Sequence, residues 1–560
     1  MVRGALALTP RSDHFEKAAW IFALICGVAP LWATQALPLV DLPQHLHLIS
    51  VLHRLNDAST LYPEIFARRP ELTPYLGYYY VVSLLNWLMP LELANRVFLS
   101  AYVVGLPLSL AFLLRSLKRP AWPALLALPF AYGDSFAWGF INYCTSLPLA
   151  LLTCGFFVRS IEDQARRRTW AIALGFSLVA VLLMHVQAFA WLGVALPFLL
   201  FTTPAPEGKN WKLRIPALVG VMPGVLLFVL WIGLRVGQPQ EIAPGQPWRS
   251  WGPMLSKENL GWKSPEQNLG EFISVPRAQD GSAKFSDVSF PILAGMVPDG
   301  SDQRAVKMVF VIALGATLLG VYLTFNEAKK SKTGLVPRLI GMFSLPGEEG
   351  PIARWRIFGL TALAFILYFA LPFDIRGYMY YLNTRYAHLA AALLVCSVPA
   401  MNEEWSKRLV YLAAVSSLIL MLPLRAAFQA FDAESAALTE LAKSAAPKPR
   451  VMGLMYATGS RAVTHPVYLH ASCVVARERG GLTNFSFALT PHSPLMYRGA
   501  PPPTFASEWR PDTMRWEEQG QAYDHFVIRG VRPEQILGQK LQTELFIAAQ
   551  AGDFFLVRKR

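Results

Sequence analysis

The chain alternates between long apolar runs and short polar links. The first run, residues 18–40, is longer than the ~20 residues that cross a bilayer as a helix. It is too long for the core of a signal peptide and no small-residue cleavage site follows it, so we predict a retained membrane anchor. Further apolar runs fall near residues 94–114, 121–135, 136–158, 170–184, 186–203, 213–236, 305–325, 355–372, 385–400 and 408–425. This pattern predicts a polytopic α-helical membrane protein with about 11–13 transmembrane helices, the number depending on whether residues 74–90 also cross.

The links between the apolar runs are mostly basic. They are residues 115–120, 159–168, 207–214, 327–338 and 403–408. Cytoplasmic loops of membrane proteins are enriched in Lys and Arg, so we place the N-terminus and all these links in the cytoplasm. Alternate crossing then places the long polar stretches 41–75 and 237–304, and everything after residue 425, on the outer face.

The C-terminal region changes character. We divide the chain into a membrane domain, residues 1–430, and a small extracytoplasmic domain, residues 431–560. The second domain shows strand-like segments at 450–456, 523–530 and 553–560, and a helix-like segment at 532–546. This mixture predicts a small α/β domain.

Composition narrows the function. The 560 residues are 54% hydrophobic and 16% charged, far below the charged fraction of a soluble domain. The net charge of +14 lies in the links, so we expect membrane lipids and no nucleic acid as partners. The five cysteines form no disulfide framework. There is no glycine-rich phosphate loop, HExxH, GxSxG or CxxC motif, which argues against chemistry driven directly by ATP.

The first polar stretch, beginning "DLPQHLHLISVLH" (41–53), places a carboxylate and three histidines beside the first membrane exit. Asp41 suits the N-cap of a helix that has a proline in its first turn. In the reduced dielectric of the interface its basicity can also be tuned for proton abstraction, so Asp41 and His45 are our candidate catalytic residues. A metal site formed with His53 is possible but not favoured, because the ligands are too few. His47 points elsewhere, and we predict no metal ligands and no certain cofactor.

Two further places put polar groups at the outer ends of spans. Asp134 and Asn142 lie in residues 131–159, and His185 and Gln187 interrupt the apolar stretch 182–192. Polar groups at membrane depth are often functional, which makes all four candidates for a substrate pocket. Helix capping and hydrogen bonding between helices are the structural alternatives.

A cationic group follows at residues 373–394. Arg376, Arg385, Tyr386 and His388 lie at the outer end of a span, against the positive-inside trend. Arginine can hold phosphate oxygens in bidentate fashion, so we predict an anion site here, with snorkelling to the interface as the alternative.

These features resemble the GT-C superfamily of integral-membrane glycosyltransferases, which includes oligosaccharyltransferases and aminoarabinose transferases. The segment "DLPQHL" (41–46) resembles the first-loop signature of a bacterial branch. The segments "GFINYCTSLPLALL" (139–152) and "NTRYAHLAAALL" (383–394) are similar to parts of its uncharacterised members. The chain lacks the adjacent Asp-Glu pair and the WWDYG-type motif of better-known branches, which puts protein glycosylation and metal dependence in doubt.

The resemblance implies an enzyme of the bacterial inner membrane that moves a hexose or pentose from a polyprenyl-phosphate donor to an acceptor hydroxyl, with inversion. The acceptor would be a glycan, a lipid or a protein. Asp41 would be the base or would anchor the acceptor, and Arg385 would hold the donor phosphate. The alternatives are a flippase or exporter of a lipid-linked glycan, and a receptor or scaffold.

Overall fold

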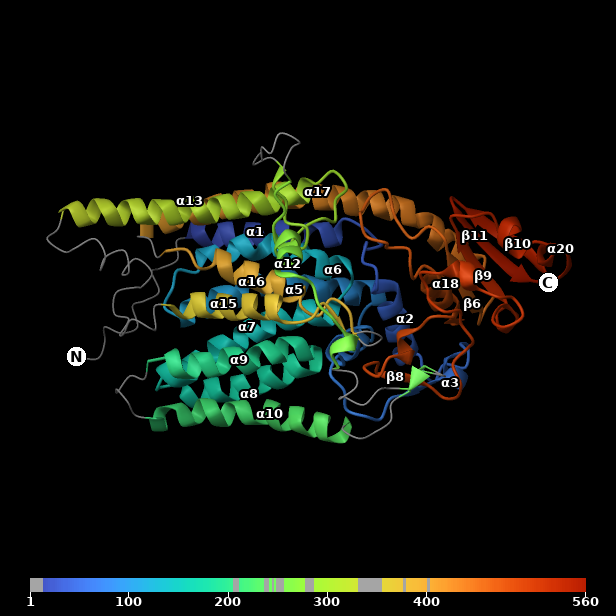
Figure 1. The fold of residues 1–560 in the computed structure, drawn as a ribbon, viewed down its shortest axis with the longest axis horizontal. Coiled ribbons are helices and arrows are strands. Elements are labelled where there is room, and N and C mark those ends of the chain that lie inside the picture. The colour runs from blue at the N-terminus through green and yellow to red at the C-terminus, as the bar shows by residue number, and fades with distance from the viewer. Residues whose placement is uncertain are drawn as a thin grey trace.

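The protein is a helical bundle with a β-sheet domain at one end (Figure 1). The computed structural model describes residues 14–204, 211–235, 241–243, 246–247, 256–276, 287–330, 355–375, 379–399 and 403–560. The helices of the bundle lie side by side along the long axis of the molecule, and the C-terminus lies in the sheet at the far end (Figure 1).

Long apolar helices build the bundle. Within the described ranges, seven are long and apolar enough to cross a membrane. They are α1 (His14–Trp32), α5 (Leu91–Ser116), α7 (Ile141–Glu162), α8 (Arg167–Met184), α10 (Ile215–Arg235), α13 (Ser301–Lys330) and α17 (Glu403–Lys443). Four shorter apolar helices accompany them: η1 (Trp122–Tyr132), α9 (Val186–Thr202), α15 (Arg356–Ala370) and α16 (Tyr386–Val395). The predicted class, a polytopic helical membrane protein, is confirmed.

The ambiguous run 74–90 forms only the nine-residue helix α4 (Gly77–Leu85). At 1.5 Å per residue, such a helix is far too short to cross a bilayer. The apolar run 121–135 forms the short 3-10 helix η1, which contains Pro129. Apolar composition alone therefore overstated the length of these two segments.

The end of the bundle away from the sheet is joined by ion pairs and a buried hydrogen bond. Glu162, at the end of α7, accepts from Arg356 of α15 at 2.9 Å and lies 3.4 Å from Lys118 beyond α5. Arg119 donates to the carbonyl of Val398 at 2.6 Å. These contacts join the ends of four helices, α5, α7, α15 and α16, at the side where the basic links were predicted.

The opposite end carries the polar loops. Residues 41–75 form α2 (Leu42–His53), α3 (Tyr62–Ile65) and β1 (Phe66–Arg68), and β1 pairs antiparallel with β8 (Leu495–Tyr497) of the C-terminal domain. In the second loop, α12 (Pro265–Phe272) follows η3 (Lys257–Asn259) and β4 (Leu260–Gly261), and β4 pairs with β5 (Asp374–Ile375). The three-residue ladder β1–β8 thus joins the first loop to the C-terminal domain, and the two-residue ladder β4–β5 joins the second loop to the segment before α16. The short pair β2 (Glu241–Ala243) and β3 (Gln246–Pro247) also lies in this loop.

The C-terminal domain is built on a mixed five-stranded sheet of order β10-β11-β9-β6-β7. Its strands are β6 (Arg450–Met455), β7 (Leu482–Thr483), β9 (His525–Arg529), β10 (Leu545–Ala551) and β11 (Phe554–Lys559). Strand β6 is parallel to both neighbours, and β11 is antiparallel to both of its own. The predicted strands at 450–456, 523–530 and 553–560 are confirmed, as is the mixed character of the domain.

The predicted helix at 532–546 is wrong in extent. It breaks at Gly538, whose positive φ of 46° ends α19 (Pro533–Leu537), and a second short helix, α20 (Lys540–Thr543), follows. Residues 545 and 546 already belong to β10, whose first side chain is buried in the domain core. Helix α17 runs from the bundle to this domain and contacts α18 (Ser472–Arg479), β10 and β11 (Figure 1).

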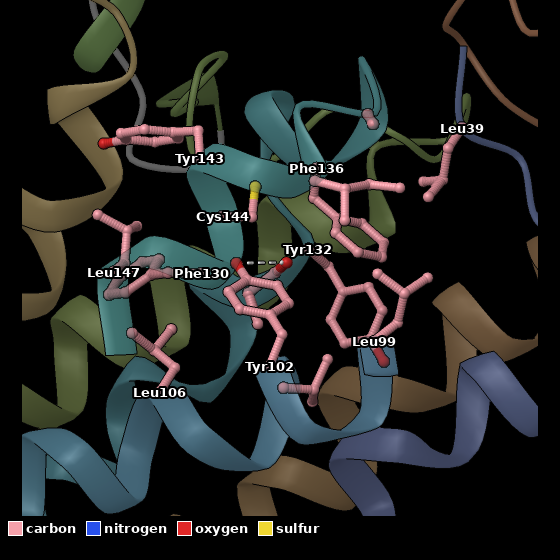
Figure 2. Close-up of a cluster of buried hydrophobic side chains, with 14 of the residues drawn as sticks. Leu39, Leu99, Tyr102, Leu106, Phe130, Tyr132, Phe136, Tyr143, Cys144 and Leu147 are labelled. Atoms are coloured by element: carbon pink, nitrogen blue, oxygen red, sulfur yellow. Dashed lines mark hydrogen bonds between the residues drawn. The ribbon is translucent and has the colours of Figure 1, made fainter. Parts of the chain in front are cut away.

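An aromatic core supports the loop end of the bundle. Phe136 stacks on Tyr102 with ring centroids 5.9 Å apart and meets Tyr132 edge-on at 5.3 Å (Figure 2). The buried Tyr102 hydroxyl donates to the carbonyl of Ala131 at 3.1 Å, which satisfies a polar group that would otherwise cost stability. This packing fixes the short helix α6 (Asp134–Ala137).

Candidate functional site

Asp41 lies immediately before α2, with Pro43 in the first turn of the helix. Its backbone N–H donates to the carbonyl of Trp138 at 3.1 Å, and the N–H of Val40 donates to Ala137 at 3.0 Å. The side chain makes no capping hydrogen bond, although this was the structural alternative for Asp41. The carboxylate is 18% exposed and does not serve as a helix cap.

A histidine from the C-terminal domain lies between Asp41 and a second carboxylate. His470 Nε2 is 3.4 Å from Asp41 Oδ1, and His470 Nδ1 is 3.2 Å from Glu508 Oε2. Burial disfavours the charged imidazole, but the charges of Glu508 and Asp41 outweigh burial and raise the pKa of His470 to about 10. At neutral pH the imidazole is therefore a cation that can donate one hydrogen bond to each carboxylate.

A second carboxylate–histidine pair lies next to the first. Asp134, the first residue of α6, is 3.0 Å from His465 Nε2, and His465 meets the ring of Trp138 edge-on. Tyr381 packs against Trp138, with ring centroids 5.0 Å apart. Burial and then the charges of Asp134, Glu271 and Asp41 raise the pKa of Tyr381 to about 12, so its hydroxyl stays protonated as a donor.

Arg385 forms the cationic part of the site. It precedes α16, is 8% exposed, and donates from Nη1 to Gln187 Oε1 at 2.6 Å. The same nitrogen is 3.1 Å from His185 Nε2. Gln187 in turn donates to the carbonyl of Leu382 at 2.8 Å, which ties the start of α9 to the segment that carries Arg385.

This cationic part has more hydrogen-bond donors than acceptors. His185 Nδ1 accepts the N–H of Gln187 at 3.1 Å, so a neutral His185 carries its proton on Nε2, facing the guanidinium of Arg385. In the described structure, Arg385 Nε and the buried Tyr75 hydroxyl have no hydrogen-bond partner. The Tyr75 ring meets His185 edge-on at 4.5 Å. Such a concentration of buried donors suits an anion with several oxygens.

One segment joins the two parts. The carbonyl of Trp138 receives the Asp41 amide, and the ring of Phe140 lies 4.2 Å from Arg385 Cζ. Tyr143 then donates its hydroxyl to the carbonyl of Arg385 at 2.5 Å. The carboxylate and the guanidinium are therefore held on the same support, residues 138–143, within a single site.

The predicted histidines of α2 do not converge on Asp41. His45 is buried, with Nδ1 2.7 Å from the Tyr79 hydroxyl and Nε2 3.1 Å from the carbonyl of Gly139. His47 contacts a carbonyl of the C-terminal domain, and His53 packs on an aromatic ring. Within the residues that the structure describes, no three His, Cys, Asp or Glu side chains form a group that could hold a metal ion.

The remaining predicted residues divide between support and site. The Asn142 side chain accepts a backbone N–H of α4, and the Tyr386 hydroxyl donates to a backbone carbonyl of α9. His388 is buried against Gly133: a Cβ at residue 133 would lie 1.8 Å from His388 Nε2. Arg376 lies outside the described residues.

Sequence reasoning missed the part of the site that comes from the C-terminal domain. His465, His470 and Glu508 follow Asp41 by more than four hundred positions, in a region without apolar periodicity. The available signal was weak: two histidines five residues apart, and an acid beside Trp509, within a domain predicted on the same face as Asp41.

Comparison with known proteins gives structural similarity alone. No family model matches the chain, and no curated protein matches its sequence. ArnT from Cupriavidus metallidurans bound to undecaprenyl phosphate is similar, with a TM-score of 0.45 and 12% identity, over 96% of this chain and 97% of that one. The archaeal oligosaccharyltransferase AglB from Archaeoglobus fulgidus, in complex with an inhibitory peptide and a dolichol-phosphate, is also similar. Its TM-score is 0.43 and its identity 12%, over 92% of this chain and 69% of that one.

At this identity, and at TM-scores below 0.5, these similarities assign no activity, which has to follow from the residues of the site.

Proposed function

We propose that this chain is a membrane glycosyltransferase that moves a sugar from a polyprenyl-phosphate donor to an acceptor hydroxyl. One observation carries the proposal: a partly exposed carboxylate, Asp41, and a buried guanidinium, Arg385, are held on one support at one end of a membrane bundle. A carboxylate that can serve as base and a cation that can hold phosphate are the two components that such a transfer needs.

The reaction follows from this arrangement. Asp41 accepts the proton of the acceptor hydroxyl while the hydroxyl oxygen attacks the anomeric carbon and forms the new glycosidic bond. The bond between that carbon and the phosphate oxygen breaks, and polyprenyl phosphate leaves with the electron pair. Arg385 and His185 stabilise the charge that grows on the phosphate. A single displacement of this kind inverts the anomeric configuration.

The fold suits a donor with a lipid tail. The proposed phosphate site lies at the ends of apolar helices, since His185 separates α8 from α9 and Arg385 immediately precedes α16. Helix α10 exposes apolar side chains such as Leu218, Val219 and Leu226, as expected for a face in contact with lipid. The isoprenoid chain can thus remain in the bilayer while its head group reaches Arg385.

We further propose that the site faces away from the cytoplasm. The basic links 115–120 and 159–168 flank α5 and α7 at the end of the bundle opposite the site. The positive-inside rule places those links in the cytoplasm. The C-terminal domain and Asp41 then lie on the outer face, in a bacterial inner membrane. The acceptor is a glycan, lipid or protein reached from that side.

Turnover of the full chain in lipid nanodiscs tests the proposal. A panel of radiolabelled polyprenyl-phosphate sugars is offered with glycan, lipid and peptide acceptors, and release of polyprenyl phosphate is measured. Asp41→Asn keeps the shape of the side chain and removes its basicity, and we expect a loss on the order of 10²–10⁴-fold in kcat. Size-exclusion profiles and Tm values confirm that the variant is folded.

Each outcome has a clear meaning. Turnover by wild type that Asp41→Asn abolishes supports the proposal. Equal turnover by both proteins keeps the enzyme class but removes Asp41 as its base. Donor binding without turnover by wild type contradicts the enzyme proposal and favours a flippase of a lipid-linked glycan.

A further inference from the structure

We infer that the C-terminal domain completes the site, with His470 as a positioning residue that holds Asp41 and Glu508 together as one unit. The inference rests on the proposed function and adds to it a residue that is more than four hundred positions away from Asp41 in the sequence. It gives the C-terminal domain a direct part in the reaction.

The geometry of His470 is that of a bridge. The side chain is 3% exposed, with one ring nitrogen 3.4 Å from Asp41 Oδ1 and the other 3.2 Å from Glu508 Oε2. An imidazole can donate from both nitrogens only when it is protonated. Each nitrogen faces a carboxylate oxygen, and Gln44 Nε2 also lies 3.4 Å from Nδ1. Only the cation can donate to both carboxylates at once.

The bridge depends on how the domain is docked. His470 lies two residues before the start of α18, and α18 packs against α2. Gln44 of α2 donates to the carbonyl of Phe485 at 2.9 Å and accepts the N–H of Phe487 at 3.3 Å. The helix that begins after Asp41 is therefore held against the segments of the domain that surround His470, which fixes the distance between the imidazole and the carboxylate.

Every neighbouring element contributes to the charge state of His470. Asp41 faces it from the residue before α2 and His45 from α2 itself. Glu508 faces it from the loop after β8, and the Phe487 ring packs edge-on against it. His45 is neutral at physiological pH because burial lowers its pKa to about 4. Two carboxylates thus act on one imidazole, and we expect it to stay charged throughout the neutral range.

The charge of this unit suits proton transfer. Before the reaction, two carboxylates and one imidazolium carry a net charge of −1. When Asp41 takes the proton of the acceptor, the unit becomes neutral, and no second charge has to be buried. Contact with His470 occupies one oxygen of Asp41 and leaves the other for the acceptor. Glu508, 27% exposed, is the end of the unit nearest to solvent.

A pH–rate comparison of full-length proteins in nanodiscs tests the inference. Glu508→Gln removes one of the two charges that raise the pKa of His470. His470 should then lose its proton at lower pH, and turnover should fall about tenfold between pH 6 and pH 9 for each unit by which its pKa drops below 9. Wild type should remain nearly constant over this range, because the pKa of His470 is about 10.

His470→Gln gives a second readout. We expect kcat to fall at least about tenfold while KM for the donor changes less than about twofold, since Arg385 is untouched. The matched control is His525→Gln. His525 is a buried histidine of the same domain, 2.5 Å from Asp524 and outside the site, and its replacement should leave the shape of the pH profile unchanged.

The outcomes separate this inference from the proposed function. An unchanged pH profile for Glu508→Gln overturns the bridge, even if His470→Gln is misfolded. If wild type shows no turnover, the proposed function fails. The imidazole ¹⁵N shifts of His470, assigned by their loss in His470→Gln, then decide the bridge alone. An imidazolium at pH 8 supports it, and titration near neutral pH contradicts it.

Discussion

Gly139 lies so close to Asp41 that a Cβ at residue 139 would be 2.9 Å from the Asp41 nitrogen and 3.0 Å from its Cβ. Gly139 also has φ +85°, a conformation that other L-residues adopt at a cost. Its carbonyl contacts His45, and the carbonyl of the preceding Trp138 receives the Asp41 amide. The position of the carboxylate therefore depends on a residue without a side chain.

Gly139→Ala should displace Asp41 and reduce activity. The methyl group cannot be accommodated by rotation of a side chain, because the atoms that it meets belong to the Asp41 backbone and Cβ. We expect strain of about 1–2 kcal/mol and at least about a tenfold loss of kcat. Turnover in nanodiscs and Tm measure the two effects.

Gly193→Ala is the matched control. Gly193 lies within α9, and a Cβ there would meet nothing within 4 Å. Alanine is the better helix former, so Tm should stay the same or rise, and turnover should not change. Equal activity of Gly139→Ala and Gly193→Ala would contradict the dependence of Asp41 on Gly139.

Arg385→Lys should weaken donor binding although the charge is kept. Lysine cannot reproduce the planar fork that contacts Gln187 and His185 and packs over Phe140. We expect KM for the donor to rise about tenfold, which corresponds to about 1.4 kcal/mol. Binding of polyprenyl phosphate by isothermal titration provides the same comparison without turnover.

Arg119→Lys is the control for Arg385→Lys. It shows whether replacing any buried arginine raises the donor KM. Arg119 is also buried, but it lies at the other end of the bundle, where it donates to Val398. Its replacement should lower Tm and leave donor KM unchanged. A similar rise in KM for both variants would show that Arg385 acts through general stability.

His45 should make the protein less stable in acid. Burial lowers the pKa of His45 to about 4, below the value of about 6.5 in an unfolded chain, so the folded state favours the neutral ring. The neutral His45 contributes fully to the free energy of unfolding above about pH 6.5. This contribution, up to roughly 3 kcal/mol, is lost as the pH falls towards 4. Tm measured from pH 8 down to pH 4.5 should fall more steeply for wild type than for His45→Gln. Parallel curves would show that His45 does not titrate as proposed.

The sequence indicated Asp41 and Arg385 as candidates but not the contacts that connect them. Asp41 was predicted because it follows the first apolar run, and Arg385 because a cation at an outer helix end opposes the positive-inside trend. Both predictions used local pattern. Contact of Asp41 with His470 depends on the docking of α2 against a domain at the other end of the chain, which no local pattern encodes.

Helical spacing was also a poor guide to the role of His45. Spacing of four residues places His45 and Asp41 on one face of an ideal helix. Asp41 lies outside the helix, however, and the His45 ring turns to Tyr79 and Gly139. The partners of a buried polar side chain are set by tertiary contacts, so the sequence could indicate a polar cluster but not the contacts within it.

Chelation should leave turnover nearly unchanged. Two carboxylates in proximity often hold a divalent cation, but here a buried imidazolium lies between Asp41 and Glu508. A metal ion bound by both would have to displace His470, which is held by the docking of the C-terminal domain. We therefore expect EDTA to change kcat by less than about twofold, and added Mg²⁺ or Mn²⁺ to have as little effect. Loss of activity that Mn²⁺ restores would contradict this expectation. Independently of turnover, His470→Gln, which opens the space between the carboxylates, should bind Mn²⁺ more tightly than wild type, as electron paramagnetic resonance can measure.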